Sequence, residues 1–306
     1  MRKVVAMGET IMDILFKNNQ PVAAVPGGSS FNSMVSIGRS HLPCAFVGYT
    51  GGDYVGQQIV DFMHLNGIST DYFEVRQGEK SALSLAYLNE DGDANYVFYK
   101  DAPRPSATAP VPQLEADDVL LYGSYFAICE GMRGLVTEVQ RRAREANSIV
   151  YYDLNFRRSH QHELDVLLPV IHANFRLSTI VRGSADDFDI MYGTRDAEEI
   201  YRQHIQPYCP LFICTAGGGC IVVCTPGQTF TFEAPRIDDV VSTVGAGDNF
   251  NAGFICGLLR YDIRRDDLLG LDRQGWQQLI DLGCQYAGEV CRSTDNYISI
   301  SAPEGR

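Results

Sequence analysis

The sequence predicts an α/β fold in which a mainly parallel sheet is covered by helices on both faces and carries a small β-sheet lid. Short apolar runs alternate with helix-period patterns along most of the 306 residues, and two segments break this alternation with period-two patterning. The 45% hydrophobic content is that of an ordinary globular protein. We expect residues 1–306 to form one domain, because α/β folds of this length often surround a single sheet.

The apolar runs indicate the strands of the main sheet. They lie at Val4–Met7, Ala45–Val47, Val119–Tyr122, Ser148–Asp153, Thr179–Val181 and Leu211–Thr215. Helical patterns between or after them cover Asn32–Ser40, Val55–Asn66, Gly131–Ala146 and Gly247–Arg260. Such alternation is typical of parallel strands joined by crossover helices, which cover both faces of the sheet.

The two segments that break the rhythm predict the lid. Residues 13–25 and 72–100 contain alternating patterns with the turn dipeptides Asn18-Asn19 and Asp91-Gly92. We expect these strands to form a small sheet that projects from the α/β body. A Pro-rich connector between Ala102 and Pro112 then leads back to the main sheet.

Composition narrows the classes of partner. The net charge of −13 disfavours nucleic acid and anionic membranes, which are bound through clustered Lys and Arg, but backbone amides and Mg²⁺ can still neutralise a small nucleotide. The first apolar run stops at Gly8-Glu9, too short for a signal peptide, and no run has membrane-spanning length. We therefore expect a cytoplasmic protein, whose nine cysteines, without a CxxC pair, are reduced and mostly buried.

The strongest motif is Gly245-Ala246-Gly247-Asp248, which opens a helical pattern. Small residues allow a tight turn with free N–H groups, and the helix dipole adds positive potential, so the segment predicts an anion hole. Asp248 follows at once and could accept the proton of an attacking hydroxyl during phosphoryl transfer. A Gly-rich turn with an Asp at a helix start is the structural alternative. The spacing fits neither a P-loop nor a dinucleotide-binding motif.

A second Gly-rich element, Pro26-Gly27-Gly28, precedes a helix that contains Asn32. Paired glycines let a ligand approach the backbone closely, and an Asn at a helix start can hydrogen-bond hydroxyl groups. Taken alone, the same residues also fit a structural turn with a helix cap.

Together these elements resemble the PfkB, or ribokinase-like, family of carbohydrate kinases nearly from end to end. The matching elements are Gly8-Glu9 with Asp13, Gly27-Gly28 with Asn32, Val47-Gly48 through Ile68, Asp153-Leu154-Asn155-Phe156-Arg157, Thr215 through Gly219, and Gly245 through Asp248. The resemblance implies a ribokinase-like three-layer α/β/α sandwich with a small β-sheet lid. It also implies an ATP-dependent kinase that phosphorylates a small sugar, with ATP and Mg²⁺ as cofactors.

Site residues follow from the resemblance position by position. Asp248 matches the catalytic base, and Gly245, Ala246 and Gly247 match the anion hole. Arg157 matches an Arg that would offset charge on the transferring phosphoryl group, with a structural salt bridge as the alternative role.

The resemblance also assigns the binding residues. Asp13, Gly28 and Asn32 match positions that hold sugar hydroxyls, and Lys100 stands where an Arg contacts substrate in related kinases, with Arg104 as its alternative. Thr215 and Gly217 match the turn that contacts the nucleotide.

The acceptor and the assembly are also expectations. We expect an unphosphorylated, fructose-like or ribose-like sugar, because no cation cluster is evident near Asp13 or Asn32. A nucleoside kinase and a non-catalytic sugar-binding regulator stay open. Lids of this type pair between subunits in the family, so we expect a homodimer formed through the lid.

Two departures from the family pattern concern cations. The NxxE element appears as Ser184-Ala185-Asp186-Asp187, so Ser184 would face the nucleotide and Asp187 would hold hydrated Mg²⁺, unless the two Asp residues only begin a helix. Ser242 replaces the Asp that opens the family's DTxGAGD motif, and we therefore do not expect activation by a monovalent cation.

Overall fold

The computed structural model describes residues 1–88, 94–101 and 110–300. Its main sheet has the order β14-β13-β12-β11-β10-β9-β1-β4-β5, with β6 also paired to β4. The strands are β1 (Val4–Met7), β4 (Cys44–Gly51), β5 (Ile68–Ser69), β6 (Phe73–Arg76), β9 (Val119–Gly123), β10 (Ile149–Asp153), β11 (Ile180–Ser184), β12 (Phe212–Thr215), β13 (Cys220–Thr225) and β14 (Gln228–Glu233). Pairing is parallel except along β12-β13-β14. The predicted parallel sheet is confirmed.

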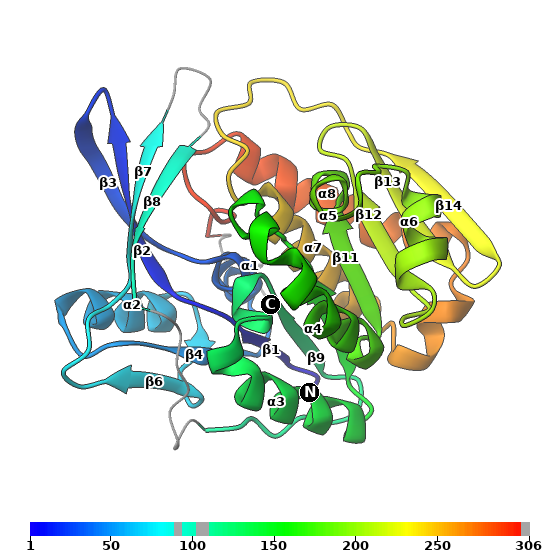
Figure 1. Ribbon diagram of the computed structural model, residues 1–306, viewed down its shortest axis with the longest axis horizontal. Coiled ribbons are helices and arrows are strands. Elements are labelled where there is room, and N and C mark those ends of the chain that lie inside the picture. The colour runs from blue at the N-terminus through cyan, green and yellow to red at the C-terminus, as the bar shows by residue number, and fades with distance from the viewer. Residues whose placement is uncertain (89–93, 102–109, 301–306) are drawn as a thin grey trace, which may run out of the picture.

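Helices cover both faces of this sheet (Figure 1). One layer contains α1 (Ser29–Arg39), α2 (Tyr54–Leu65), α7 (Ala246–Arg260) and α8 (Arg273–Cys291), and the other contains α3 (Arg133–Glu145), α4 (Leu164–Leu177), α5 (Ala185–Tyr192) and α6 (Ala197–Ile200). Short helical turns lie at Tyr125–Ala127, Glu130–Met132, Arg158–Glu163, Tyr201–Ile205 and Arg265–Gly270. The three-layer α/β/α prediction is thus confirmed.

Strand β1 shows why the sheet requires two cores. Val4 and Ala6 face the core under α1 and α7, whereas Val5 and Met7 face the core under α3 and α4. Successive side chains of a strand point to opposite faces, so an uninterrupted apolar run is what a doubly covered strand needs. In the described part of the chain, no helix combines the length and apolar character needed to cross a bilayer.

The lid is a second sheet with the order β3-β2-β7-β8. It comprises β2 (Ile11–Lys17), β3 (Gln20–Gly27), β7 (Leu83–Leu88) and β8 (Ala94–Tyr99), and it projects beside the body at the left of Figure 1. Asn18 and Asn19 both have positive φ, 51° and 61°, as the tight β2–β3 turn demands. The second predicted turn, Asp91-Gly92, lies outside the described residues.

The lid starts later in the second segment than residue 72. Strand β6 pairs with β4 in the main sheet, and Phe73 packs against the core under α1 and α2. Its alternating pattern is that of any strand with one covered face, so the pattern alone does not say which sheet the strand joins. The lid prediction was wrong for this stretch, and the second segment contributes β7 and β8.

All nine predicted thiols are free cysteines, and most are buried. Cys220 is the exposed member and Cys284 is partly buried.

Candidate active site

The site forms where the carboxyl ends of three parallel strands meet the N-termini of α1 and α7. Asp153, Ser184 and Thr215 are the last residues of β10, β11 and β12. The carboxyl ends of parallel strands lie at one edge of a sheet, which is where ligands bind in open α/β folds.

Gly245 shapes the turn that begins α7. Its φ of 79° is left-handed, and a Cβ there would lie 3.1 Å from the carbonyl oxygen of Asn296, so glycine is needed for both reasons. Asn249 fixes the turn, because its Nδ2 donates to the carbonyls of Gly245 and Asn296 at 2.8 Å. One expectation needs correction. The amide of Ala246 is not free but donates to Thr243 O at 3.2 Å, which leaves the neighbouring glycine amides for an anion.

Asp248 lies in the first turn of α7 and is held from α1. Its Oδ1 accepts from Ser29 Oγ at 2.8 Å, and its Oδ2 accepts from Asn32 Nδ2 at 2.9 Å. Ser33 Oγ donates to the Asp248 carbonyl at 2.7 Å, which ties the two helices together. The carboxylate therefore has one fixed orientation.

The surroundings of Asp248 tune its basicity. Desolvation raises the pKa of Asp248 to about 6. Hydrogen bonds from Asn32 and Ser29 and the charge of Arg157 act to lower this pKa, and the charge of Asp153 acts to raise it. A carboxyl group with a pKa near 6 is ionised at neutral pH yet basic enough to take a proton in the transition state.

Asp13 and Asn32 lie on either side of Gly27, which precedes Gly28. Asp13 is 8% exposed and accepts from Ser84 Oγ, and burial raises its pKa to about 6. A Cβ on Gly27 would collide with the Asp13 carboxylate and lie 3.8 Å from Asn32 Oδ1, so both side chains flank this glycine. Asn32 Oδ1 is buried without a hydrogen-bond partner in the described chain. An acceptor in this position suits a ligand hydroxyl.

Asn155 and Ser124 extend the support of the base. Asn155 Nδ2 donates to Ser29 Oγ at 2.9 Å and to Ser124 Oγ at 2.8 Å. Asn155 and Ser124 both have positive φ, 39° and 53°, in the loops after β10 and β9. Arg157, two residues further on, is exposed, and its charge reaches Asp248. Sequence reasoning identified Arg157 but missed Ser29, Ser124 and Asn155 as site residues.

Arg182, which the sequence reasoning also missed, lies in a buried network at the base of the site. Its Nη1 donates to Asp153 Oδ1 at 2.9 Å, and its Nη2 donates to Thr215 Oγ1 at 2.7 Å. Asn251 Nδ2 donates to the other Asp153 oxygen at 2.9 Å. Thr215, predicted to contact nucleotide, is thus joined to β10, whereas Gly217 lies in the following turn with φ 55° and open space around its Cα.

Ser184 and Asp187 form a capping box at the start of α5. Ser184 Oγ accepts from the Asp187 amide at 3.1 Å, and Asp187 Oδ2 accepts from the Ser184 amide at 2.7 Å. Asp186 is exposed and pairs with Arg195. Some of the polar groups that were predicted to bind nucleotide and metal therefore cap the N-terminus of α5 instead. Within residues 1–88, 94–101 and 110–300, no group of three or more His, Cys, Asp or Glu could hold a metal ion.

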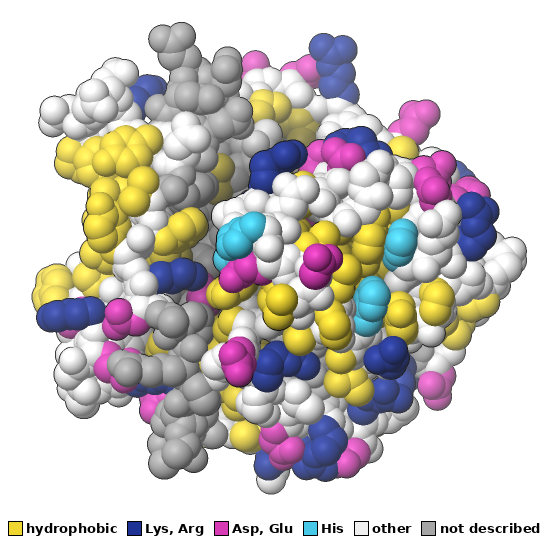
Figure 2. Space-filling view, viewed as in Figure 1, with side chains coloured by type: hydrophobic (Ala, Val, Ile, Leu, Met, Phe, Trp, Pro, Cys, Tyr) yellow, Lys and Arg dark blue, Asp and Glu magenta, His cyan; other side chains and the backbone are white. Residues whose placement is uncertain are grey.

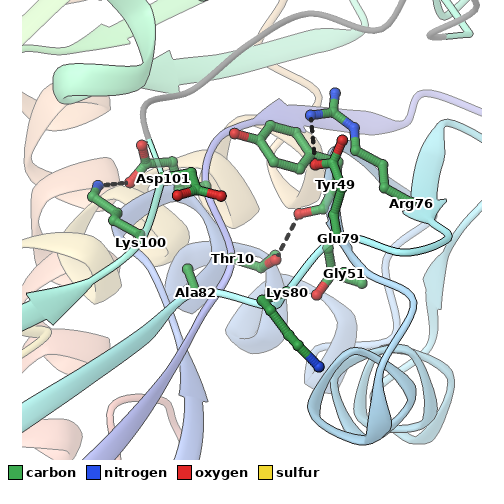
Figure 3. A pocket seen from close by; sticks show the side chains of 11 residues that line it. Thr10, Tyr49, Gly51, Arg76, Glu79, Lys80, Ala82, Lys100 and Asp101 are labelled. Carbon is green, nitrogen blue, oxygen red and sulfur yellow. Dashed lines mark hydrogen bonds and ion pairs between the residues drawn. The ribbon is translucent and has the colours of Figure 1, made fainter.

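Lys100 lines a pocket between the lid and the body (Figure 3). Its Nζ pairs with the Glu9 carboxylate. Opposite it, the guanidinium of Arg76 lies 3.5 Å from the Tyr49 ring centroid and pairs with Glu74 at 2.9 Å. The pocket adjoins the acceptor residues, because a Cβ on Gly28 would collide with the carbonyl of Glu9. Arg104, the alternative to Lys100, lies outside the described residues.

Known proteins share this architecture. Aminoimidazole riboside kinase of Salmonella typhimurium is 26% identical over 263 residues, which cover 85% of this chain and 82% of that protein. A fructokinase of Escherichia coli is 25% identical over 271 residues, 87% of each chain. The crystal structure of aminoimidazole riboside kinase from Salmonella enterica, complexed with aminoimidazole riboside and an ATP analog, matches with a TM-score of 0.84 at 22% identity, over 99% of this chain and 98% of that one.

The family model for pfkB family carbohydrate kinases matches residues 1–303. It spans the main sheet, the lid and the Asp248 site alike. This chain belongs to the pfkB family of carbohydrate kinases.

Proposed function

We propose that this protein transfers the γ-phosphoryl group of ATP to a hydroxyl of a small, unphosphorylated sugar. The observation that carries the proposal is the Asp248 carboxylate, fixed by Ser29 and Asn32 directly after the anion-binding turn. A partly buried base next to free amides at a helix N-terminus is the arrangement that hydroxyl phosphorylation needs.

The roles of the residues follow from their positions. Asp13 and Asn32 Oδ1 accept hydrogen bonds from acceptor hydroxyls, and the reacting hydroxyl gives its proton to Asp248 as its oxygen bonds to the γ-phosphorus. The bond from that phosphorus to the bridging oxygen breaks, and ADP leaves. The amides of Gly245 and Gly247 and the Arg157 cation stabilise charge on the phosphoryl oxygens.

An uncharged acceptor fits the charges around the lid pocket. Three cations line it, Arg76, Lys80 and Lys100, together with the carboxylates of Glu9, Glu79 and Asp101. Arg76 pairs with Glu74 and Glu79, and Lys100 pairs with Glu9. A phosphate bound by Arg76 or Lys100 would have to break these pairs, whereas a polyol can hydrogen-bond to them as they stand.

Magnesium would act mainly through the nucleotide. Mg²⁺ keeps most of its waters and is held by substrate phosphates with one or two carboxylates, so a single carboxylate of the protein is enough for this mode. The Asp187 carboxylate is the group we assign to the hydrated ion, with only Oδ2 used in the capping box. When bound, the ion neutralises charge on the ATP phosphates.

The lid supports a homodimer. Apolar side chains on its strands remain exposed, and Figure 2 shows such side chains gathered on the lid at the left of the view. The largest are Val22, Tyr87, Val97, Phe98 and Tyr99. Exposed apolar patches and sheet edges of this kind favour association, and we propose that two lids pack on each other.

A riboside is the second candidate acceptor, because one relative is a kinase of aminoimidazole riboside. The deciding experiment measures ADP release with Mg²⁺ and ATP across fructose, ribose, aminoimidazole riboside, adenosine and inosine. Turnover with fructose or ribose supports the proposal, and turnover with ribosides alone replaces it with the second candidate. Saturable sugar binding without ADP release from any compound would indicate a non-catalytic regulator instead.

A further inference from the structure

Arg182 packs against the Gly245–Gly247 turn. A Cβ on Gly247 would lie 3.2 Å from Arg182 Nη2 and 3.3 Å from Nη1, so the guanidinium is packed against the backbone of this turn. Arg182 itself is 5% exposed and comes from β11. A full positive charge is thus fixed next to Gly247 in the proposed anion-binding turn.

The same guanidinium joins the other two parts of the site. It donates to Asp153 at the end of β10 and to Thr215 at the start of the proposed nucleotide turn. Rotation of any one of these elements would break a contact with Arg182. The planar fork of an arginine suits such a three-way junction, which the single ammonium of a lysine cannot reproduce.

Arg182 is paired with a buried carboxylate, but not all of its N–H groups have hydrogen-bond partners. Burial acts to lower the pKa of Arg182, but the charge and hydrogen bond of Asp153, together with Tyr151 and Asp187, raise this pKa above its ordinary value, so the guanidinium is always charged. Asp187 adds a second, more distant carboxylate, whose pKa burial raises. Arg182 Nε is buried and has no hydrogen-bond partner in the described chain. Buried ion pairs add little stability compared with apolar residues, so stability alone gives a weak reason for this arrangement.

We propose that Arg182 is a positioning residue for phosphoryl transfer, which holds Gly247 and Thr215 in register and shields Asp248 from the negative charge of Asp153. The inference rests on the proposed function, because it assigns phosphate binding to the Gly247 turn. The charge of Asp153 raises the pKa of Asp248 and that of Arg157 lowers it, and the Arg182 guanidinium, paired with Asp153 at 2.9 Å, offsets part of the Asp153 charge.

The test compares Arg182→Lys, Arg182→Met, Asp153→Asn and the double variant with Arg182→Met and Asp153→Asn. Arg133→Met is the matched control, because Arg133 is also partly buried but binds Ala127 O and Asn174 outside the site. We would measure kcat and KM for ATP over a pH series, the affinity for ADP by calorimetry, and the melting temperature of each variant.

We expect kcat to fall about tenfold to hundredfold in Arg182→Met and less in Arg182→Lys, with weaker ADP binding in both. Without Arg182 the Asp153 charge is unshielded, so the acid limb of the pH profile moves up by roughly half a unit to one unit. In Asp153→Asn the acid limb of the pH profile moves to lower pH. The double variant carries no unpaired charge and should melt near the native temperature, yet its kcat should stay about tenfold below that of Asp153→Asn.

A purely structural ion pair gives a different pattern. The double variant would then match Asp153→Asn in kcat, and Arg182→Met would keep the native acid limb while it lost stability. Either result overturns the inference, even if Arg182→Met alone fails to fold. Asp248→Asn separates this from failure of the proposed function. If Asp248→Asn is inactive but the Arg182 variants behave like Arg133→Met, only the role of Arg182 is wrong.

Discussion

The edge of the main sheet and the lid are built in opposite ways. At the edge, Asp153, Arg182 and Asn251 form a buried network, which Thr215 and Tyr151 extend, with hydrogen bonds between 2.7 and 3.0 Å. Asp248 is held there by two donors. The lid instead exposes apolar side chains such as Phe98 at 56%. Satisfied polar networks hold one geometry, whereas thin sheets with few buried contacts adapt. We therefore expect the body to fix the chemistry and the lid, through Asp13, to contribute to the choice of acceptor.

The largest effect should come from the body. Asp248→Asn keeps the size of the side chain but removes the base, so kcat should fall at least about a thousandfold while KM for ATP changes little. Steady-state ADP release measures both quantities, with Arg133→Met as the control for folding. A variant that keeps more than a tenth of native kcat would show that another group takes the proton.

Asp13→Asn should affect the acceptor rather than ATP. We expect KM for the sugar to rise roughly tenfold to hundredfold, because a charge-assisted hydrogen bond is replaced by a neutral one. KM for ATP should stay constant. An equal rise in both values would contradict the division between lid and body.

The same substitution should stabilise the protein at high pH. The folded pKa of Asp13 is about 6, above the value near 4 of an unfolded chain, so its contribution to stability is present below pH 4 and is lost as pH rises through 6. Asn removes this loss, and unfolding at pH 8 should cost roughly 1–3 kcal/mol more than in the native protein. Denaturant unfolding at pH 4 and pH 8 measures the difference. A gain of equal size at both pH values would show that ionisation is not its cause.

The pH profile should show both carboxyl groups. Asp248 and Asp13 each have a pKa of about 6, and both act as anions, so kcat/KM should fall below pH 6 with a slope approaching two. In Asp13→Asn the slope should return to one. If kcat/KM of the native protein falls only below pH 5, neither carboxyl group is desolvated in solution.

A smaller effect concerns the assembly. Phe98→Ser, combined with Val22→Ser, should shift a homodimer toward monomer, because it removes exposed apolar area from the lid. Light scattering after gel filtration measures this, with Leu65→Ser on α2 as an exposed control away from the lid. A native protein that is monomeric at micromolar concentration would refute the dimer.

The smallest effect should be that of K⁺. The Ser242 side chain is a neutral hydroxyl, so it cannot neutralise the charge of a bound cation as a carboxylate would. Its Oγ accepts a hydrogen bond from the Val244 amide at 3.2 Å. Exchange of K⁺ for Na⁺ should therefore change kcat less than about twofold, whereas Ser242→Asp should increase the dependence on K⁺. Strong activation of the native protein by K⁺ would overturn this expectation.

Local patterns indicated the candidate parts of the site that are continuous in sequence, but each pattern alone also fitted a structural turn, and the resemblance to the family selected the functional interpretation. The Gly245–Asp248 turn and the Gly27-Gly28 element carry their own backbone requirements, so they could be recognised without the fold. The strand positions followed from apolar runs for the same reason. The cytoplasmic location stays a prediction, because no structural observation tests it.

The remaining residues could not be predicted, since long-range packing brings them together. Ser29 contacts Asp248 across 219 residues, and nothing in its sequence context indicates a partner. Arg182 did leave a signal, because an arginine within the apolar run of β11 requires a buried counter-charge. The error over β6 had the same origin, since its partner β4 is set by tertiary structure.

The clamp on Asp248 by α1 also affects when the protein becomes active during folding. The donor Ser29 lies in α1 and the acceptor Asp248 lies in α7. Their hydrogen bond therefore closes a loop of 219 residues. Closing so long a loop is slow compared with forming local helices and hairpins. A growing chain thus acquires most of its sheet before it has an oriented base, and recovery of turnover after denaturation should report the docking of α7 on α1.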